Sequence, residues 1–414
     1  MYPKHRYDAA EVKFFFENVD WDFADAWTRH GLSLLHWYPT KLPPQVASWL
    51  ITGLTAKGEV ICDPFCGSGT VLAEAMRLGR RAMGFDVSPI AGLISKARTT
   101  LIPLSRLSRG IKTFLERLKF GIDLLNHSIL ALPASLQEQE ALSLVNSERT
   151  NPPNPQMAQW FHPTVFRDIC FASQCIDLEA DEGIRRLLTV VFSSLLRTCS
   201  SQLRSWGYIA DNVVPRQYIY KDVYAIYTNR LHNVERGMRI FVEQCTSGGM
   251  TIPVANALVR VRCADSRQLD FIQANSIDCI VTSPPYGNVS DNVMSQRLSM
   301  LWFGHNLEDT KRSEIGARWK RFRQAASEAY VHEMTQCLVE CSRILKPGGR
   351  LAIVWGTSSK WEKRHPTSET LRSFLSDTLR MEVLATFRRK IASCRQHGSY
   401  GVLYEDILIY RKGR

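Results

Sequence analysis

The sequence of 414 residues lacks the features that mark several common classes of protein. Its eleven cysteines form no Cys-x-x-Cys pair and no Cys/His cluster at zinc spacing, so we expect no metal site and reduced thiols. No stretch approaches the roughly 18 apolar residues that a membrane helix requires. The opening MYPKHRYDAAEVKFFF lacks the apolar core of a secretion signal. Together these absences predict a cytoplasmic protein without a membrane segment.

Charge is the first positive indication of function. The formal net charge is +12, and surplus Lys and Arg favour phosphate-rich partners because binding releases counterions. Many basic proteins bind no nucleic acid, so charge alone leaves the partner open. The hydrophobic content of 45% indicates a folded interior and argues against a mostly disordered chain.

Alternating apolar segments predict an α/β protein with a mostly parallel sheet. From 58 to 88 we expect a strand, a glycine-rich turn, a helix and a second strand ending at Asp86. The pattern returns after Ile252 with strands in 259–266 and 277–287, a helix over 327–345 stopped by Lys-Pro-Gly-Gly, and a strand over 350–356. The segments 382–391 and 405–412 could close the sheet as an antiparallel pair.

The region between these two blocks has a different character. Helical periodicity appears in 110–125 and 184–199, and the Pro/Asn-rich segment 151–155 between them is expected to be a loop. We therefore predict a helical insertion in one sheet. The expected division is an N-terminal segment 1–57 beside the cofactor site, a catalytic domain of 58–100 and 251–414, and the insertion 101–250.

The glycine-rich turn suits a nucleoside ligand. The first strand ends at Asp63, and Gly67 and Gly69 let the backbone approach a ligand where a helix begins near Thr70. Asp86, at the next strand end, can accept both hydroxyls of a ribose. A dinucleotide fingerprint is incomplete because Leu72 occupies its third small position. The phosphate-loop ending is absent, and a tight turn without a ligand is the plainest alternative.

The segment Asp63-Pro64-Phe65-Cys66-Gly67-Ser68-Gly69-Thr70 resembles the cofactor motif of S-adenosylmethionine-dependent DNA amino-methyltransferases. The resemblance implies a Rossmann-like class I methyltransferase sheet and S-adenosylmethionine as cofactor. It implies cofactor-binding roles for these residues of the segment: Asp63, Phe65, Cys66, Gly67, Ser68, Gly69 and Thr70.

Three further residues are assigned to the cofactor. Asp86 is expected at the ribose, and by resemblance Asp265 binds the adenine amine. Residues 36–43 resemble the family's His-Pro-Thr-x-Lys-Pro segment with altered spacing, which implies that Lys41 pairs with the cofactor carboxylate. The plain alternatives are a solvated strand-end aspartate for Asp265 and a solvated lysine for Lys41.

A second motif, Ser283-Pro284-Pro285-Tyr286, follows an apolar strand and should lie at its carboxyl end, where α/β sheets bind ligands. Two prolines make a rigid turn rich in acceptors. If Ser283 Oγ and the Pro284 carbonyl each accept one N–H bond, a base amine is held with its lone pair toward a methyl donor. Tyr286 would stack on the base, which must be flipped or single-stranded. A purely structural turn is the alternative.

By resemblance, Ser-Pro-Pro-Tyr is typical of cytosine-N4 methyltransferases, whereas adenine-N6 enzymes more often carry Asp or Asn first. Direct transfer to cytosine N4 in double-stranded DNA is therefore the leading prediction. Adenine-N6 DNA methylation and RNA guanine-N2 methylation are the alternatives, together with a binding protein that has lost catalysis. Cytosine-C5 methylation is excluded because no Pro-Cys pair supplies its nucleophile.

Basic and aromatic residues downstream of this turn predict a nucleic-acid surface. A solvated basic surface is the alternative. The predicted contacts are Arg312, Arg318, Trp319, Lys320, Arg321 and Arg323. A second cluster, Arg388, Arg389, Lys390 and Arg395, is more readily explained as solvated charge.

The family's usual positions for a target-recognition region have no room in this chain. We therefore predict that 101–250 contributes recognition, with dimerisation or packing as the alternative. A homodimer and a cognate restriction endonuclease, as in restriction-modification systems, are further candidate partners implied by the resemblance.

Overall fold

A computed structural model describes residues 8–24, 32, 35–39, 41–127, 139, 154–202, 214–287, 289–322, 325–356, 362–363, 365–391 and 402–413. It contains a seven-stranded sheet of order β3-β2-β1-β4-β5-β7-β6. The strands are β1 (Val60–Asp63), β2 (Arg81–Asp86), β3 (Val259–Cys263), β4 (Ile277–Thr282), β5 (Leu345–Gly356), β6 (Met381–Lys390) and β7 (Tyr404–Lys412). β7 pairs antiparallel with both neighbours, and the other pairs are parallel. The predicted fold class is confirmed.

The strand order determines where a ligand can bind. From β1 the chain moves outward through β2 to β3, and it then returns to the other side of β1 to form β4. The order therefore reverses between β1 and β4, and open α/β sheets bind ligands in the crevice beyond the carboxyl ends of such strands. Asp63 ends β1 and Thr282 ends β4, so both predicted motifs begin at this crevice.

One expected boundary differs. Helix α14 (Ala326–Ile344) ends just before Lys-Pro-Gly-Gly, as expected, but β5 begins at Leu345 and includes these four residues. Leu345 pairs with Ile277, after which the register between β4 and β5 is irregular until Cys279 pairs with Arg350. Gly348 has a φ of 73°, a conformation that favours glycine. The glycines thus accommodate a bulge within the strand.

Helices cover both faces of the sheet. Alternate strand residues such as Ile61 and Val281 join α1 (Ala9–Phe16), α2 (Pro44–Leu54) and α3 (Thr70–Arg77) in one core. Their neighbours, such as Cys62 and Ile280, join α14 and α16 (Thr367–Ser373) in another. A short π-helix, η4 (Phe374–Thr378), follows α16 directly. Because side chains alternate along a strand, these cores lie on opposite faces.

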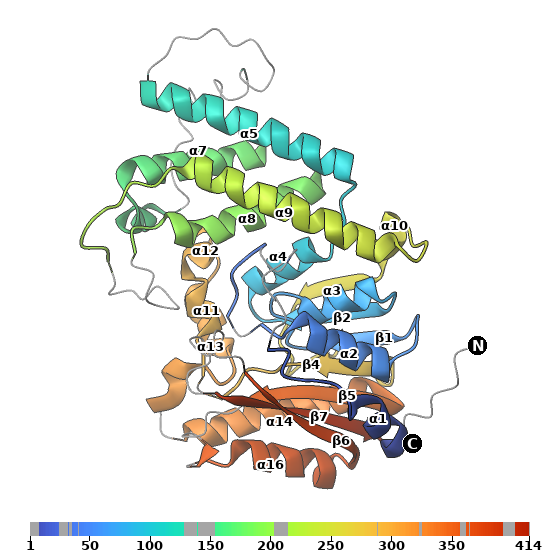
Figure 1. Cartoon of the computed structure of the whole chain (residues 1–414). Coiled ribbons are helices and arrows are strands. Elements are labelled where there is room, and N and C mark those ends of the chain that lie inside the picture. The colour runs from blue at the N-terminus through green and yellow to red at the C-terminus, as the bar shows by residue number, and fades with distance from the viewer. Residues whose placement is uncertain are drawn as a thin grey trace.

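The predicted insertion is helical, and it forms a layer beyond α4 (Figure 1). Its described elements are α5 (Leu104–His127), η2 (Pro155–Trp160), α7 (Pro163–Asp177), α8 (Glu182–Cys199) and α9 (Val223–Thr246). The short helix α10 (Ile252–Ala257) follows the insertion and leads into β3. Asn151, Pro152 and Pro153 of the expected loop lie outside the described residues.

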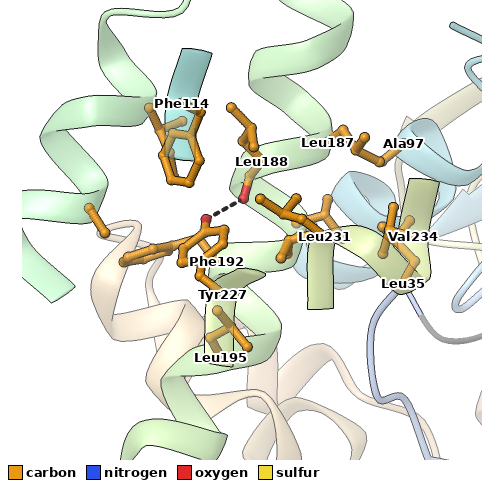
Figure 2. Close-up of a cluster of buried hydrophobic side chains, with 14 of the residues drawn as sticks. Leu35, Ala97, Phe114, Leu187, Leu188, Phe192, Leu195, Tyr227, Leu231 and Val234 are labelled. Atoms are coloured by element: carbon orange, nitrogen blue, oxygen red, sulfur yellow. Dashed lines mark hydrogen bonds between the residues drawn. The ribbon is translucent and has the colours of Figure 1, made fainter. Parts of the chain in front are cut away.

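The helical layer shares its core with the catalytic part of the chain. Figure 2 shows Ala97 of α4 (Pro89–Arg98) beside Leu187 of α8, and the Tyr227 hydroxyl donating to the Leu188 carbonyl at 2.9 Å. The same cluster includes Met76 of α3 and Trp302. The insertion is therefore packed onto the sheet domain through a continuous apolar interior.

A run of short helices follows β4 and reaches toward the helical layer (Figure 1). These are α11 (Asn292–Ser295), α12 (Arg297–Trp302), α13 (Leu307–Ser313) and η3 (Arg318–Phe322). Helix α12 contacts α8, α4 and η2. This run connects the crevice at the sheet with the insertion.

Candidate active site

The glycine turn after β1 is tightly packed. Gly67 and Gly69 have φ angles of 47° and 76°, which non-glycine residues rarely adopt. Gly69 caps α3. The Gly67 carbonyl accepts a 2.7 Å hydrogen bond from Ser95 Oγ of α4, and the Tyr38 ring packs against Gly67. Tyr38 and Ser95 thus fill the space that side chains at Gly67 and Gly69 would occupy.

Asp86 is half-buried beside this turn. Its carboxylate accepts the backbone N–H groups of Gly67 at 3.0 Å and Ser88 at 2.9 Å. Burial raises its pKa to about 6, although these two hydrogen bonds act in the opposite direction. Each carboxylate oxygen retains capacity to accept a second hydrogen bond, so the position can serve the ribose hydroxyls predicted for it.

The two motifs are joined by a direct hydrogen bond. Thr282 Oγ1, immediately before Ser283, donates to Asp63 Oδ1 at 2.7 Å. Burial raises the pKa of Asp63 to about 7, opposed by this bond and by the bond from the Phe65 N–H. The turn that follows β4 is fixed further by Tyr330, whose hydroxyl donates to the Pro285 carbonyl at 2.9 Å. The Ser-Pro-Pro-Tyr turn thus has a defined position relative to the glycine turn.

Tyr286 is almost enclosed, at 8% exposure. Its hydroxyl lies 3.1 Å from Ser283 Oγ and donates to Glu405 Oε1 at 2.7 Å. Burial, and then the Glu405 carboxylate, raises the pKa of Tyr286 well above its ordinary value. The phenol is therefore a neutral group whose proton is available for donation. The predicted stacking of its ring on a base remains a prediction.

Both motifs line one pocket with about 970 Å³ of empty space, part of it open to solvent. The pocket brings together all four predicted catalytic residues and every predicted cofactor residue except Gly69, which lies behind the wall as the cap of α3. These residues are Lys41, Asp63, Phe65, Cys66, Gly67, Ser68, Thr70, Asp86, Asp265, Ser283, Pro284, Pro285 and Tyr286.

The N-terminal segment contributes a wall. Tyr38, Lys41 and Leu42 line the pocket. Lys41 Nζ donates to the His36 carbonyl at 2.6 Å, and burial lowers the pKa of Lys41 well below its ordinary value. A solvated lysine, the plain alternative, does not describe this side chain. Its pairing with a cofactor carboxylate remains a prediction.

Asp265 lies at the pocket in an ion pair that the sequence did not predict. Its carboxylate contacts Arg267 Nη2 at 2.6 Å, and Arg267 also contacts Glu333 at 3.0 Å. The pKa of Asp265 is lowered because the hydrogen bonds from Arg267 outweigh partial burial. Asp265 is therefore a charged and oriented acceptor rather than a freely solvated aspartate.

Glu314 is a pocket residue that the sequence analysis missed. It is 5% exposed, and its Oε1 accepts the N–H groups of Asn292 at 2.5 Å and Val293 at 3.4 Å. Within the described residues its Oε2 is buried without a hydrogen-bond partner. Burial raises its pKa to about 8. No motif surrounds this glutamate, so only the packing of the 292–315 segment could reveal it.

The residues predicted to bind nucleic acid have different surroundings. The Arg312 side chain is 73% exposed, whereas Lys320 is 15% exposed, pairs with Glu333 and donates to the Glu314 carbonyl at 2.6 Å. The Trp319 ring lies 5.1 Å from Lys311 Nζ. Arg318 begins η3, the Arg321 side chain is not described, and Arg323 lies outside the described residues. Lys320 therefore holds the loop that bears Glu314.

The second basic cluster is paired within the sheet. Arg389 is 2% exposed and pairs with Glu405, and Arg388 pairs with Asp406 at 2.6 Å. Arg395 lies outside the described residues. Across the described part of the chain, no three His, Cys, Asp or Glu side chains are grouped as a metal site requires. No helix in those ranges is long and apolar enough to cross a membrane.

The chain is similar to known DNA methylases. A family model, N6_N4_Mtase, described as DNA methylase, matches residues 5–94, which include the glycine turn. The type II methyltransferase M.MvaI of Kocuria varians is 26% identical over 317 residues, 74% of this chain and 65% of that protein. M.MjaII of Methanocaldococcus jannaschii is 20% identical over 405 residues, 81% of this chain and 75% of that protein. The chain thus spans just under two thirds of the length of M.MvaI.

Solved structures resemble the chain less closely. The rRNA methyltransferase aviRa of Streptomyces viridochromogenes is 12% identical, with 91% of this chain and 89% of that chain covered and a TM-score of 0.36. Because this TM-score is low, the fold is assigned from the strand order of the sheet itself.

Proposed function

We propose, on the premise that the chain belongs to the N6/N4 family of S-adenosylmethionine-dependent DNA methylases, that it methylates an exocyclic amine of a DNA base. The main supporting observation is that the glycine turn and the Ser-Pro-Pro-Tyr turn line one pocket and are joined by the Thr282–Asp63 hydrogen bond. A cofactor held by the first turn and an amine held by the second would meet in this pocket.

The cofactor side of the pocket fits S-adenosylmethionine. When bound, S-adenosylmethionine supplies a methyl group on a positively charged sulfur. Asp86 would accept the ribose hydroxyls, and Gly67 lines the pocket without a side chain of its own. Of the three carboxyl groups at the pocket, Asp63, Asp86 and Glu314, Asp86 has the lowest pKa, about 6, and is mostly ionised at neutral pH. Its negative charge favours a cationic ligand.

The substrate side of the pocket fits a base amine. Ser283 Oγ and the Pro284 carbonyl are acceptors on a turn whose backbone is fixed by two prolines. If each accepts one amine hydrogen, the nitrogen lone pair is directed at the methyl donor, so orientation replaces covalent activation. A paired base cannot enter such a pocket, so the base would be flipped from the duplex.

Cytosine N4 is the proposed position of methylation. The proposal depends on Ser283, because the family's Ser-Pro-Pro-Tyr variant is typical of enzymes that act on cytosine. Adenine N6 is the second candidate, since the matching family includes methylation of both amines. The two bases share the chemistry of an aromatic amine, and the described pocket residues suit either.

Contacts with the DNA backbone are proposed for the surface beside the pocket. Arg312 is exposed on α13, and Arg318, Trp319, Lys320, Arg321 and Arg323 follow it along the chain. Basic residues interleaved with an aromatic suit phosphate neutralisation and base stacking. Because the Lys320 ammonium is engaged by Glu333 and two carbonyls, we assign it a supporting role for the loop.

A labelled transfer reaction tests the proposal. The protein would be incubated with methyl-labelled S-adenosylmethionine and duplex DNA, single-stranded DNA or tRNA, and the nucleosides would be identified by mass spectrometry. We expect N4-methyldeoxycytidine from duplex DNA. N6-methyldeoxyadenosine would support the second candidate, and label in tRNA alone would contradict the proposed substrate.

A further inference from the structure

A chain of polar side chains extends from Ser283 into the C-terminal strands. Ser283 Oγ lies 3.1 Å from the Tyr286 hydroxyl, which donates to Glu405 Oε1 at 2.7 Å. The other Glu405 oxygen pairs with Nη1 of Arg389. Glu405 on β7 and Arg389 on β6 are direct cross-strand partners. The sheet edge thus reaches the predicted catalytic serine through one phenol.

The chemistry of these groups fixes the direction of proton donation. A carboxylate can only accept, so the Tyr286 hydroxyl must give its single proton to Glu405. The phenol oxygen then has only lone pairs for Ser283, and the serine proton is donated to the phenol. The lone pairs of Ser283 Oγ remain for the pocket. A group that meets Ser283 there therefore meets an acceptor.

Arg389 keeps Glu405 in place. Its guanidinium is 2% exposed and donates from Nε to the Trp21 carbonyl at 2.9 Å in addition to its pair with Glu405. Arginine does not lose its proton in proteins, so the buried Glu405 carboxylate has a permanent counter-charge. Trp21 belongs to the N-terminal segment, which ties this end of the sheet to the opposite end of the chain.

The ring of Tyr286 has little freedom to leave this arrangement. A Cβ atom added at Gly356 would lie 2.5 Å from its Cε2 atom, and one side of Gly356 is also packed by Val402. Gly356 ends β5 and pairs with Glu405 of β7. Because Gly356 has no side chain, the Tyr286 ring fits against it. Glu405, which pairs with Gly356 across the β5–β7 ladder, accepts the Tyr286 hydroxyl.

We propose that Glu405 and Arg389 are positioning residues, which orient the hydrogen bonds of Tyr286 and Ser283 so that Ser283 Oγ accepts a hydrogen from the substrate amine. The inference depends on the proposed methyl transfer. It assigns to Tyr286 a second task beside base stacking. It also gives a role to the Glu405–Arg389 ion pair. If the hydrogen bonds ran in the opposite direction, Ser283 would present its proton to the amine and could not accept from it.

Glu405→Gln tests the inference, because an amide can donate to the phenol and reverse the chain. We expect kcat to fall by about tenfold or more, while the KM for DNA and the Kd for S-adenosylmethionine change by less than about twofold. The matched control is Asp406→Asn. Asp406 is the next residue of β7, is also paired with two arginines, Arg372 and Arg388, and belongs to no described contact with Ser283 or Tyr286. It should retain kcat.

Tyr286→Phe completes a double-mutant cycle, since it removes the hydroxyl but keeps the ring. It should lower kcat by itself. Adding Glu405→Gln should then have no further effect on kcat, because the hydrogen-bond chain from Ser283 to Glu405 is already interrupted. Equal losses from Glu405→Gln in both backgrounds, or full kcat in Tyr286→Phe, would overturn the inference. If Glu405→Gln fails to fold by circular dichroism, the Tyr286→Phe result decides. A wild-type protein that methylates no DNA would instead contradict the proposed function.

Discussion

Substitutions of two side chains, Ser283 and Asp86, can distinguish the substrate side of the pocket from its cofactor side. Ser283 lies on the substrate turn, whereas Asp86 ends β2 and accepts the Gly67 N–H of the glycine turn. We predict that Ser283→Ala lowers kcat by on the order of 100-fold, because one oriented polar contact to the reacting group is lost. The Kd for S-adenosylmethionine should stay within about twofold. Steady-state kinetics and calorimetry measure the two quantities.

Asp86→Asn provides the comparison for Ser283→Ala. It replaces a half-buried acceptor on the cofactor side and should weaken S-adenosylmethionine binding more than it lowers kcat at saturation. If both variants lost cofactor affinity equally, the assignment of Ser283 to the substrate side would be wrong.

Glu314 predicts a pH dependence of stability. Burial raises its pKa from 4.5 to about 8, so the folded protein retains a proton that the unfolded chain has released. The stabilisation from this group is full below about pH 4.5 and is lost as the pH rises through about 8. Glu314→Gln cannot ionise. The Tm of Glu314→Gln minus the Tm of wild type should therefore increase by a few degrees as the pH rises from about 6 to about 8.

Thermal melting of the unliganded wild-type and Glu314→Gln proteins at about pH 6 and about pH 8 measures this difference in Tm. Asp63 and Asp86 titrate in the same range but are present in both proteins, so their effects cancel. Glu308→Gln on α13, whose side chain is 59% exposed, should show the same difference from wild type at both pH values. A pH-independent difference for Glu314→Gln would show that its carboxyl does not titrate as described.

Individual residues also show where sequence reasoning ends. The residues of each motif are contiguous in the chain and follow a strand, so the sequence predicted both motifs at strand ends, and both line one pocket. Their roles there remain predictions. Glu314 meets the pocket only because the 292–315 segment folds over it, and Glu405 meets Tyr286 only because β7 inserts between β5 and β6. Neither has a local pattern that distinguishes it from a surface glutamate.

At the scale of elements, the glycine turn illustrates how a backbone conformation serves a site. A Cβ atom at Gly69 would lie 2.9–3.0 Å from the side chain and backbone of Ser95, whereas one at Gly79 would meet nothing within 4 Å. The two glycines have similar φ angles, 76° and 71°. Substitution by alanine therefore imposes a similar backbone strain of about 1–2 kcal/mol at each, but only at Gly69 must α4 also move.

We predict that Gly69→Ala weakens S-adenosylmethionine binding by about tenfold or more, equivalent to about 1.4 kcal/mol. Gly79→Ala should lower the Tm with an unchanged Kd, because Gly79 lies at the far end of α3 from the pocket. Calorimetric titration of both variants measures the effect. Equal affinities in the two variants would mean that the Gly69 turn does not shape the cofactor site.

Element boundaries were predictable where local signals and pairing agree. The strand over Arg81–Asp86 ends where the acidic residue and the following Ser-Pro cap indicate. The Lys-Pro-Gly-Gly segment was expected to lie between helix and strand, yet its residues belong to β5. Pairing of Leu345 with Ile277 determines that boundary, and a pairing partner 68 positions away leaves no local trace in the sequence.

At the scale of the whole molecule, the insertion is packed against the pocket wall. Ser193 of α8 lies 2.9 Å from His36 Nε2, and the Arg197 guanidinium lies 4.1 Å from the centre of the Trp37 ring. Residues 36 and 37 lead directly into Tyr38 and Lys41 of the pocket. The periodicity of the sequence predicted these helices, but their shared core with α3 and α4 depends on packing between distant segments.

The basic residues of the insertion are not equivalent. Arg117 is 4% exposed and donates to the Cys175 carbonyl, so it supports the fold and its side chain does not face a DNA partner. Arg109 and Arg216 are exposed, and Arg204 lies outside the described residues. A recognition role would therefore involve the surface of the helical layer and not its interior.

We predict that replacing 101–250 by the corresponding segment of a related methylase changes the methylated DNA sequence. The reason is that this layer adjoins the segment that leads into the pocket wall and carries exposed basic residues, whereas the proposed site contacts only the base. Sequencing of methylated DNA gives the target of the chimera. A matched chimera that exchanges only the buried residues of α8 and α9 should retain the original target. An unchanged target in a full exchange that still binds S-adenosylmethionine would assign the layer to packing or dimerisation instead.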